Sequence, residues 1–241
     1  MSFLPVCTSA TDAVDSYRRY GACIVRLPHT ESWDYALKLL LSWCHGCESY
    51  VWRHPEWLEK LSRAEGDDSP GSRHSLNHFG NNSHHEWQAV LKFLQCHNVV
   101  SDMLASLAVD IGRTSFELNV CGGDVVKSHA NTGQAVHSDG KPPSSESELR
   151  RTPWLAMSVA VHDIDVTNAP LSFWGIDSMA QHYDAISFPK APEDVGLKFE
   201  DTLVCMSRGD IFIRNPLVWH CGTSNLGEST RYLPAMIWSA D

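Results

Sequence analysis

Apolar residues recur at helical spacing through the first part of the chain. Thr30 precedes a stripe with intervals of three and four residues, which predicts a helix capped by this threonine. The stripe consists of Trp33, Ala36, Leu40 and Trp43. The same pattern predicts further helices over residues 11–21, capped by Thr11, and over residues 55–61, 83–94 and 103–111. One strand is expected among them, over residues 22–27. Because the other predicted elements are helices, we expect residues 1–112 to form mainly helical support for the core.

The pattern changes near residue 115, where short apolar runs begin to alternate with turn residues. These runs cover residues 116–121, 124–128, 154–161, 203–206, 210–213 and 232–238. Many short strands without long helices between them predict a sandwich or barrel, in which closure of the sheets protects their edges. Because the boundary carries no Pro/Gly linker, we expect one domain over residues 1–241 with its β core in residues 115–241.

Composition and charge narrow the class of protein. Hydrophobic residues make up 43% and charged residues 20% of 241, which is typical of a globular protein. The formal net charge is 19 − 29 = −10, which disfavours nucleic acid as a partner. We expect a small-molecule substrate, no membrane span, and a cytoplasmic location by default, because neither a secretory pattern nor a C-terminal peroxisomal tripeptide is visible. The sequence does not predict the oligomeric state.

Eight cysteines raise the question of disulfides or a thiol-bound metal. Only Cys44 and Cys47 have ligand spacing, and no second pair accompanies them. The two residues are expected to close a helix, whereas a redox Cys-x-x-Cys usually opens one. We therefore interpret the cysteines as reduced thiols without a chemical role.

A His-x-Asp sequence supplies the first candidate ligands. His137 and Asp139 are two residues apart, so on a strand their side chains would share one face. His220 is the candidate third ligand, and two histidines with one carboxylate are typical of non-haem Fe(II) oxygenases. A second copy, His182 and Asp184, leaves only 35 residues before His220 against 80 for the first copy. We interpret the second copy as surface residues, because several strands must separate the ligands.

An arginine eleven residues after His220 strengthens this hypothesis. Arg231 opens an apolar run, and the turn composition of residues 222–228 predicts a hairpin that would place Arg231 beside His220 on the adjacent strand. A guanidinium in an apolar strand needs a partner. That partner is either an acid of the protein or the acid of a ligand, which the guanidinium could bind bidentately.

Together these residues resemble the phytanoyl-CoA dioxygenase family of Fe(II)- and 2-oxoglutarate-dependent oxygenases. The resemblance covers roughly residues 115–241, and the strand near residues 20–27 suits it. It is carried by Gly209–Ile213, Trp219, His220, Asn225, Arg231 and the spacing Gln134-x-x-His137-x-Asp139. It implies a double-stranded β-helix (jelly-roll, cupin-like) core packed by the N-terminal helices.

The resemblance also implies the roles of the site residues. His137, Asp139 and His220 would bind Fe(II), Arg231 would grip the distal carboxylate of 2-oxoglutarate, and Gln134 could contact the near carboxylate. The implied reaction consumes O2, with ascorbate as a stimulant, and oxidises a small organic substrate, most simply by hydroxylation, with release of succinate and CO2. Catalysis would rest on the iron, so no separate catalytic side chain is assigned.

The substrate and the reaction subtype stay open. The stretch 168–178 lacks the Pro-Gly-Ser-His end found in many family members. Substrate contacts are expected from a lid over residues 66–83 and from nearby helices, and the candidates are Trp52, His54, Trp57, Arg73, His74, His78 and Phe79. Two alternatives to the oxygenase are a non-catalytic binding module on the same barrel and a cupin-like metalloenzyme without a co-substrate.

Overall fold

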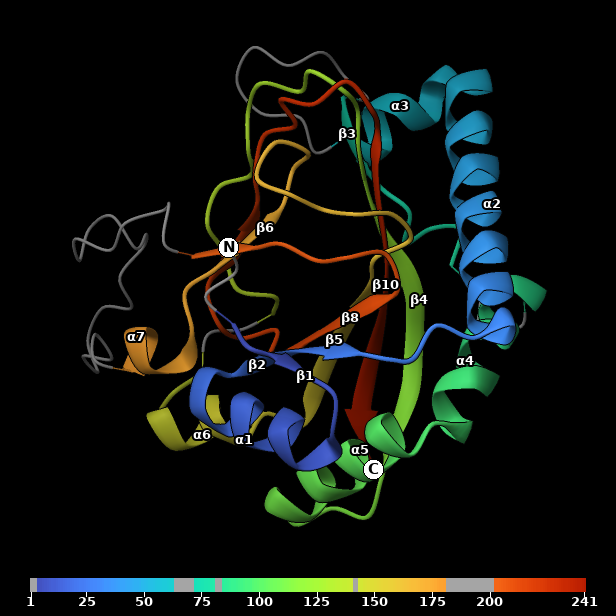
Figure 1. Ribbon diagram of the computed structural model, residues 1–241. Coiled ribbons are helices and arrows are strands. Elements are labelled where there is room, and N and C mark those ends of the chain that lie inside the picture. The colour runs from blue at the N-terminus through green and yellow to red at the C-terminus, as the bar shows by residue number, and fades with distance from the viewer. Residues whose placement is uncertain (1–3, 63–71, 81–83, 141–142, 181–201) are drawn as a thin grey trace.

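The computed structural model describes residues 4–62, 72–80, 84–140, 143–180 and 202–241. Figure 1 shows helices grouped around the outside of a β core. The helices are α1 (Ala10–Tyr20), α2 (Glu31–Arg53), α3 (Pro55–Leu61), α4 (His85–Cys96), α5 (Asn98–Asp110), α6 (Glu146–Arg150) and α7 (Ile176–Ala180). The strands are β1 (Val6–Cys7), β2 (Ala22–Arg26), β3 (Arg73–Ser75), β4 (Phe116–Val126), β5 (Trp154–Val159), β6 (Leu171–Phe173), β7 (Leu203–Val204), β8 (Asp210–Arg214), β9 (His220–Gly222) and β10 (Arg231–Ala240).

The expected helices form, but several of their ends differ, and α5 begins at Asn98, five residues before the expected start. Ser9 rather than Thr11 caps α1, since its hydroxyl accepts from the amide of Asp12 at 3.1 Å. Thr30 caps α2 as expected. However, α2 runs on to Arg53, so the prediction that the cysteine pair closes this helix is wrong. The apolar face of α2 extends past the cysteines, and packing against the core keeps this long helix intact.

The strands form two sheets, as the expected jelly-roll core requires. The large sheet has the order β1-β2-β8-β5-β10-β4-β3, and the small sheet has the order β7-β6-β9. Side chains of the two sheets meet in the interior. The rings of Phe173 on β6 and Phe212 on β8 pack edge to face there, with 5.6 Å between the ring centroids. The expected fold class is therefore confirmed.

Strand β10 shows how the sheet separates its two environments. The side chains of Tyr232, Met236 and Trp238 point away from the other sheet and pack in the hydrophobic layer between the large sheet and the helices. Alternate residues, which point the other way in a strand, line an interior cavity: Arg231, Leu233, Ala235 and Ile237. One strand thus anchors the helical layer and supplies one wall of the cavity.

The structure departs from the sequence prediction in how the N-terminal part contributes. Residues 1–112 supply β1, β2 and β3 to the large sheet, so this part is more than helical support. Part of the predicted lid is a strand instead, because β3 (Arg73–Ser75) is buried and pairs with β4, whereas Asn77 of the same stretch lines the interior cavity. Residues 66–71 and 81–83 of that stretch, Ser83 included, lie outside the described residues. Among the described helices, none has an apolar stretch of the length that a bilayer requires.

Candidate functional site

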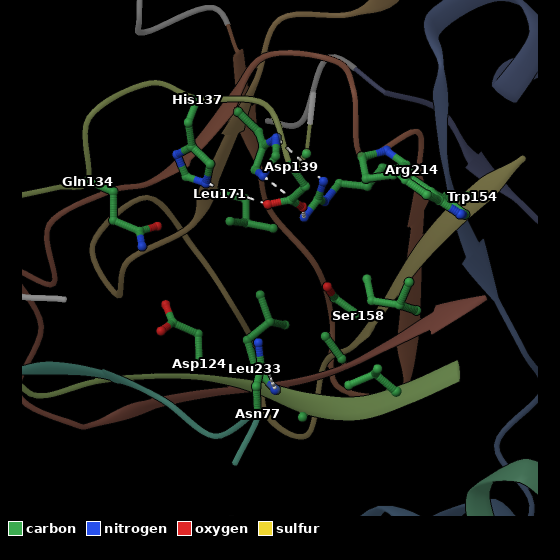
Figure 2. A pocket seen from close by; sticks show the side chains of 18 of the residues that line it. Asn77, Asp124, Gln134, His137, Asp139, Trp154, Ser158, Leu171, Arg214 and Leu233 are labelled. Carbon is green, nitrogen blue, oxygen red and sulfur yellow. Dashed lines mark hydrogen bonds and ion pairs between the residues drawn. The ribbon is translucent and has the colours of Figure 1, made fainter. Parts of the chain in front are cut away.

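A cavity of about 310 Å³ lies between the two sheets. Figure 2 shows His137, Asp139 and Arg214 along one side of it, with Asp124 and Leu233 across from them. The floor is the inward face of the large sheet, where Ala235 on β10 pairs with Gly122 on β4 and Ser158 on β5. These three small residues leave room in front of the histidine and aspartate side chains.

The backbone brings the three candidate metal ligands together. His137 and His220 exchange backbone hydrogen bonds of 3.0 and 2.9 Å, and the amide of Asp139 donates to the carbonyl of Pro216 at 2.8 Å. The segment from His137 to Asp139 therefore runs alongside residues 216–220, which lead into β9. Their ligand atoms lie within 4.8 Å of one another, close enough to hold one metal ion.

Both imidazole rings direct their Nε2 atoms toward the place where a metal ion would lie. Nδ1 of His137 lies 2.8 Å from the carbonyl of Ala135, and Nδ1 of His220 lies 2.8 Å from that of Val218. A carbonyl only accepts, so each Nδ1 carries a proton and each Nε2 keeps a free lone pair. Such a backbone contact fixes the tautomer and orientation of a metal-binding histidine.

Electrostatics hold these groups in the form that binds a metal. Burial raises the pKa of Asp139, but the positive charge of Arg214 outweighs burial and holds this pKa well below its usual range. Burial, followed by the positive charge of Arg214, lowers the pKa of His220 to about 4. At neutral pH the site therefore offers the carboxylate of Asp139 and the neutral imidazole of His220.

The opposite end of the cavity holds Arg231, whose side chain is completely buried. Its Nη2 lies 3.3 Å from Oδ2 of Asp124, and Nη1 of Arg73 lies 3.3 Å from the same oxygen. Two guanidinium groups thus share one carboxylate. Burial lowers the pKa of Arg231 to about 10, so this side chain stays charged at neutral pH.

The expected hairpin geometry around Arg231 is wrong. His220 lies on β9 of the small sheet, whereas Arg231 lies on β10 of the large sheet, so they face the cavity from opposite sides. The turn between them crosses from one sheet to the other instead of forming adjacent strands. Of the two kinds of partner expected for this arginine, an acid of the protein is present, Asp124, but Arg73 shares the same carboxylate oxygen.

Gln134 also lies in this cavity, as its place in the sequence suggests. Its Oε1 accepts from the amide of Gly222 at 3.0 Å. A Cβ at Gly222 would lie 2.3 Å from Nη1 of Arg73 and 2.9 Å from Oε1 of Gln134. A side chain at position 222 would therefore displace Arg73 and Gln134 from their places over β9.

Of the substrate residues predicted from the lid and the helices, Arg73 lies at the arginine end of the cavity, and the other six are not among the residues that line it. Ring contacts join Trp57, His78, Phe79 and His54 around Tyr50, and Trp52 lies under the ammonium group of Lys127. Among the described residues that line the cavity, the candidates at its open end are instead Val120 and Trp154, each 43% exposed, with Ile237 beside them. His182 and Asp184 lie outside the described residues.

Sequence reasoning missed Asp124 and Arg214. Both occur at the edge of an apolar run, as Arg231 does, and the requirement that a buried charge needs a partner could have marked them. The eight cysteines are free. Burial raises the pKa of Cys47 to about 12, and that of its neighbour Cys44 is raised by burial as well, so neither thiol is activated.

Comparison with known proteins identifies relatives by fold. The sequence matches no family model and no curated protein. AviO1 from Streptomyces viridochromogenes Tue57 superposes with a TM-score of 0.64 at 15% identity, over 97% of this chain and 96% of that one. SnoK, a non-heme alpha ketoglutarate dependent carbocyclase from nogalamycin biosynthesis, gives a TM-score of 0.65 at 17% identity, over 96% and 86%.

A third solved structure shows what this fold binds in another protein. The epimerase SnoN, in complex with Fe3+, alpha ketoglutarate and nogalamycin RO, superposes with a TM-score of 0.61 at 14% identity, over 95% of this chain and 83% of that one. At these identities the likeness establishes the fold. Membership of the phytanoyl-CoA dioxygenase family stays a prediction.

Proposed function

We propose that the protein is a non-haem Fe(II)- and 2-oxoglutarate-dependent dioxygenase that oxidises a small organic substrate. The observation that supports this most strongly is the pairing of two unlike sites in one cavity. One end carries two imidazole nitrogens and a carboxylate within 4.8 Å of one another. The other end carries a buried arginine pair with a single aspartate.

The donor set fits ferrous iron. Two histidines and one carboxylate on one side of a metal leave positions for a co-substrate and O2. His137, Asp139 and His220 would hold the ion, and their orientation comes from contacts already formed in the protein. When bound, the iron would supply the activation of O2 that no side chain can provide.

The arginine end fits a dicarboxylate. The formal charges of Arg73, Arg231 and Asp124 sum to +2 − 1 = +1, so one negative charge is needed to balance them. Nε and Nη1 of Arg231 are buried and have no hydrogen-bond partner among the described residues. An incoming carboxylate could satisfy these donors and would bind strongly in a water-poor environment.

The chain's own residues then act by binding, orienting and excluding water. Arg231 would hold the distal carboxylate of 2-oxoglutarate, and Gln134 lies in the cavity where it could contact the near carboxylate. Leu171 and Leu233 provide apolar walls between the two ends. The substrate would enter over Val120, Trp154 and Ile237 and meet the metal above the small residues of the floor.

Hydroxylation is the simplest outcome of this chemistry and is the one proposed. The carbocyclase SnoK and the epimerase SnoN share the fold, so products of ring closure and of inversion should be sought as well. Two alternatives remain, a cupin-like enzyme without a co-substrate and a non-catalytic binding module. Neither explains why the residues around Arg231 carry one uncompensated positive charge.

Succinate formation tests the proposal. The purified protein is incubated in air with Fe(II), ascorbate and 2-oxoglutarate, first alone and then with a library of metabolites. We expect slow succinate release that a substrate accelerates, and loss of this release in Asp139→Ala. Metal binding without any 2-oxoglutarate consumption across the library, or activity untouched by Arg231→Met, would favour the cupin-like alternative.

A further inference from the structure

Arg214 lies against the candidate metal ligands although nothing in the resemblance assigns it a role. It ends β8, paired with Ala22 on β2 and Ala156 on β5, so the strand ladder fixes its backbone on both sides. Its side chain lines the cavity, and the residue is only 9% exposed. Figure 2 shows the guanidinium group beside Asp139.

The contacts of Arg214 involve the carboxylate far more than the imidazole. Nη2 donates to Oδ2 of Asp139 at 2.9 Å. Nη1 lies 3.4 Å from Nδ1 of His220, but that nitrogen donates its own proton to Val218 and cannot also accept. The arginine therefore hydrogen-bonds the carboxylate and packs against the ring.

This arrangement has two opposing consequences for a metal ion. A fixed positive charge near the site repels the ion and withdraws electron density from Asp139. The same hydrogen bond restricts rotation of the carboxylate. Its Oδ1, which Arg214 does not hold, lies 3.9 Å from Nε2 of His137, and its Oδ2, which Arg214 holds, lies 3.4 Å from Nε2 of His220. Because Asp139 is half-exposed to the cavity, the carboxylate would otherwise be free to turn toward water.

We propose that Arg214 is a positioning residue that holds Asp139 in the ligating orientation and keeps it a one-oxygen ligand. One carboxylate oxygen is taken by the guanidinium group, so only the other is free to bind a metal without competition. The inference rests on the proposed metal site and goes beyond it, since it concerns how that site excludes two-oxygen binding. We expect the gain from orienting Asp139 to exceed the repulsion between Arg214 and the metal ion, because hydrogen-bond partners of ligating carboxylates typically raise metal affinity.

Mn(II) and Co(II) titrations of the full chain test this role without any turnover. Mn(II) affinity is measured by the loss of free-ion electron paramagnetic resonance signal in wild type, Arg214→Met and Arg214→Lys. We expect Arg214→Met to weaken binding about 10–100-fold. Lysine keeps one charged donor, so Arg214→Lys should remain within about threefold of wild type.

A matched control comes from the other end of the same strand. Arg26 makes two 2.7 Å hydrogen bonds to Asp210 on β8 without touching a candidate ligand. Arg26→Met should leave Mn(II) affinity unchanged, whatever its effect on the melting temperature. This control separates loss of an arginine–aspartate pair in general from loss of the pair at Asp139.

The visible spectrum of bound Co(II) reports ligand geometry, which a merely structural role would not change. In Arg214→Met we expect an altered band shape as the second carboxylate oxygen becomes available, and in Arg214→Lys the wild-type spectrum. Equal or tighter Mn(II) binding by Arg214→Met, with an unchanged Co(II) spectrum, would overturn the inference. If Arg214→Met does not fold, Arg214→Leu, which likewise has no hydrogen-bond donor, takes its place with the same expectations. Failure of the wild type to bind either ion would instead contradict the proposed function itself.

Discussion

The two ends of the cavity carry the same kinds of residue and yet suit opposite ligands. At one end Asp139 contacts one arginine, Arg214, at 2.9 Å. At the other end Asp124 lies 3.3 Å from two arginines, Arg73 and Arg231. The formal charges sum to 0 at the first end and to +1 at the second.

The difference shows that the number of arginines around each aspartate, rather than the residue types present, decides the charge of the ligand that each end can bind. The neutral end adds two imidazole lone pairs and can take a cation. The positive end has buried guanidinium nitrogens without partners among the described residues and can take an anion. Buried ion pairs stabilise a fold weakly at best, so a stability role alone explains neither arrangement.

The largest effect is expected from removal of the carboxylate at the metal end. Asp139→Ala deletes one of three ligands and leaves Arg214 without its acid, so the neutral end becomes positive. Mn(II) affinity should fall by more than the about 10–100-fold typical of outer partners. Electron paramagnetic resonance measures this, and Asp177→Ala, which removes an exposed partner of Arg150, is the control. Retained Mn(II) affinity in Asp139→Ala would refute the ligand assignment.

Loss of the arginine at the other end should separate co-substrate binding from metal binding. Arg231→Met removes charge-assisted hydrogen bonds worth about 1.5–3 kcal/mol each, so the Kd for 2-oxoglutarate should rise about 10–100-fold. Mn(II) affinity should not change, because Arg231 faces the metal end from the opposite sheet. High 2-oxoglutarate should partly restore succinate formation. Calorimetry of 2-oxoglutarate binding to the Mn(II) protein measures the first effect, and parallel losses of both affinities would contradict a two-ended cavity.

Asp124→Asn should act in the opposite direction at the same end. The substitution raises the formal charge from +1 to +2, which should tighten 2-oxoglutarate binding about three- to tenfold. Without ligand the variant should melt at a lower temperature, because two buried guanidinium groups lose their acid. Added 2-oxoglutarate should recover more of the melting temperature than it does in wild type. Weaker binding in this variant would mean that Asp124 orients Arg231 and does not compete with the co-substrate.

The smallest effect is expected at Gln134. Its Oε1 already accepts from Gly222, so it contributes at most its amide group to a ligand. Gln134→Leu should raise the Kd for 2-oxoglutarate about two- to fivefold, the loss of one neutral hydrogen bond. An effect as large as that of Arg231→Met would show that the near carboxylate, and not the distal one, supplies most of the binding.

Sequence alone predicted the grouping of His137, Asp139 and His220 better than the surroundings of Arg231. The spacing of His137 and Asp139 sufficed to place them on one face, because alternation along an extended segment is a local property. The meeting of that segment with His220 needed the resemblance, since no local rule brings residues so far apart together. The many short apolar runs predicted a sandwich or barrel, and the resemblance narrowed this to the jelly-roll class.

The anion end depended on pairing that no local pattern shows. Arg73 was assigned to a lid because its neighbours are polar, yet three residues there are enough to pair with β4 and bury the side chain. Arg231 was placed on the wrong side of the cavity because the turn after β9 crosses between sheets. Arg214 was missed because the predicted strand stopped at Ile213, one residue before the charge.

A crystal structure grown without oxygen in the presence of Mn(II) and 2-oxoglutarate tests the central claim most directly. The account predicts one ion bound by Nε2 of His137, Nε2 of His220 and a single oxygen of Asp139, with the distal carboxylate of 2-oxoglutarate against Arg231. An ion held by other residues, or 2-oxoglutarate bound away from Arg231, would contradict the account.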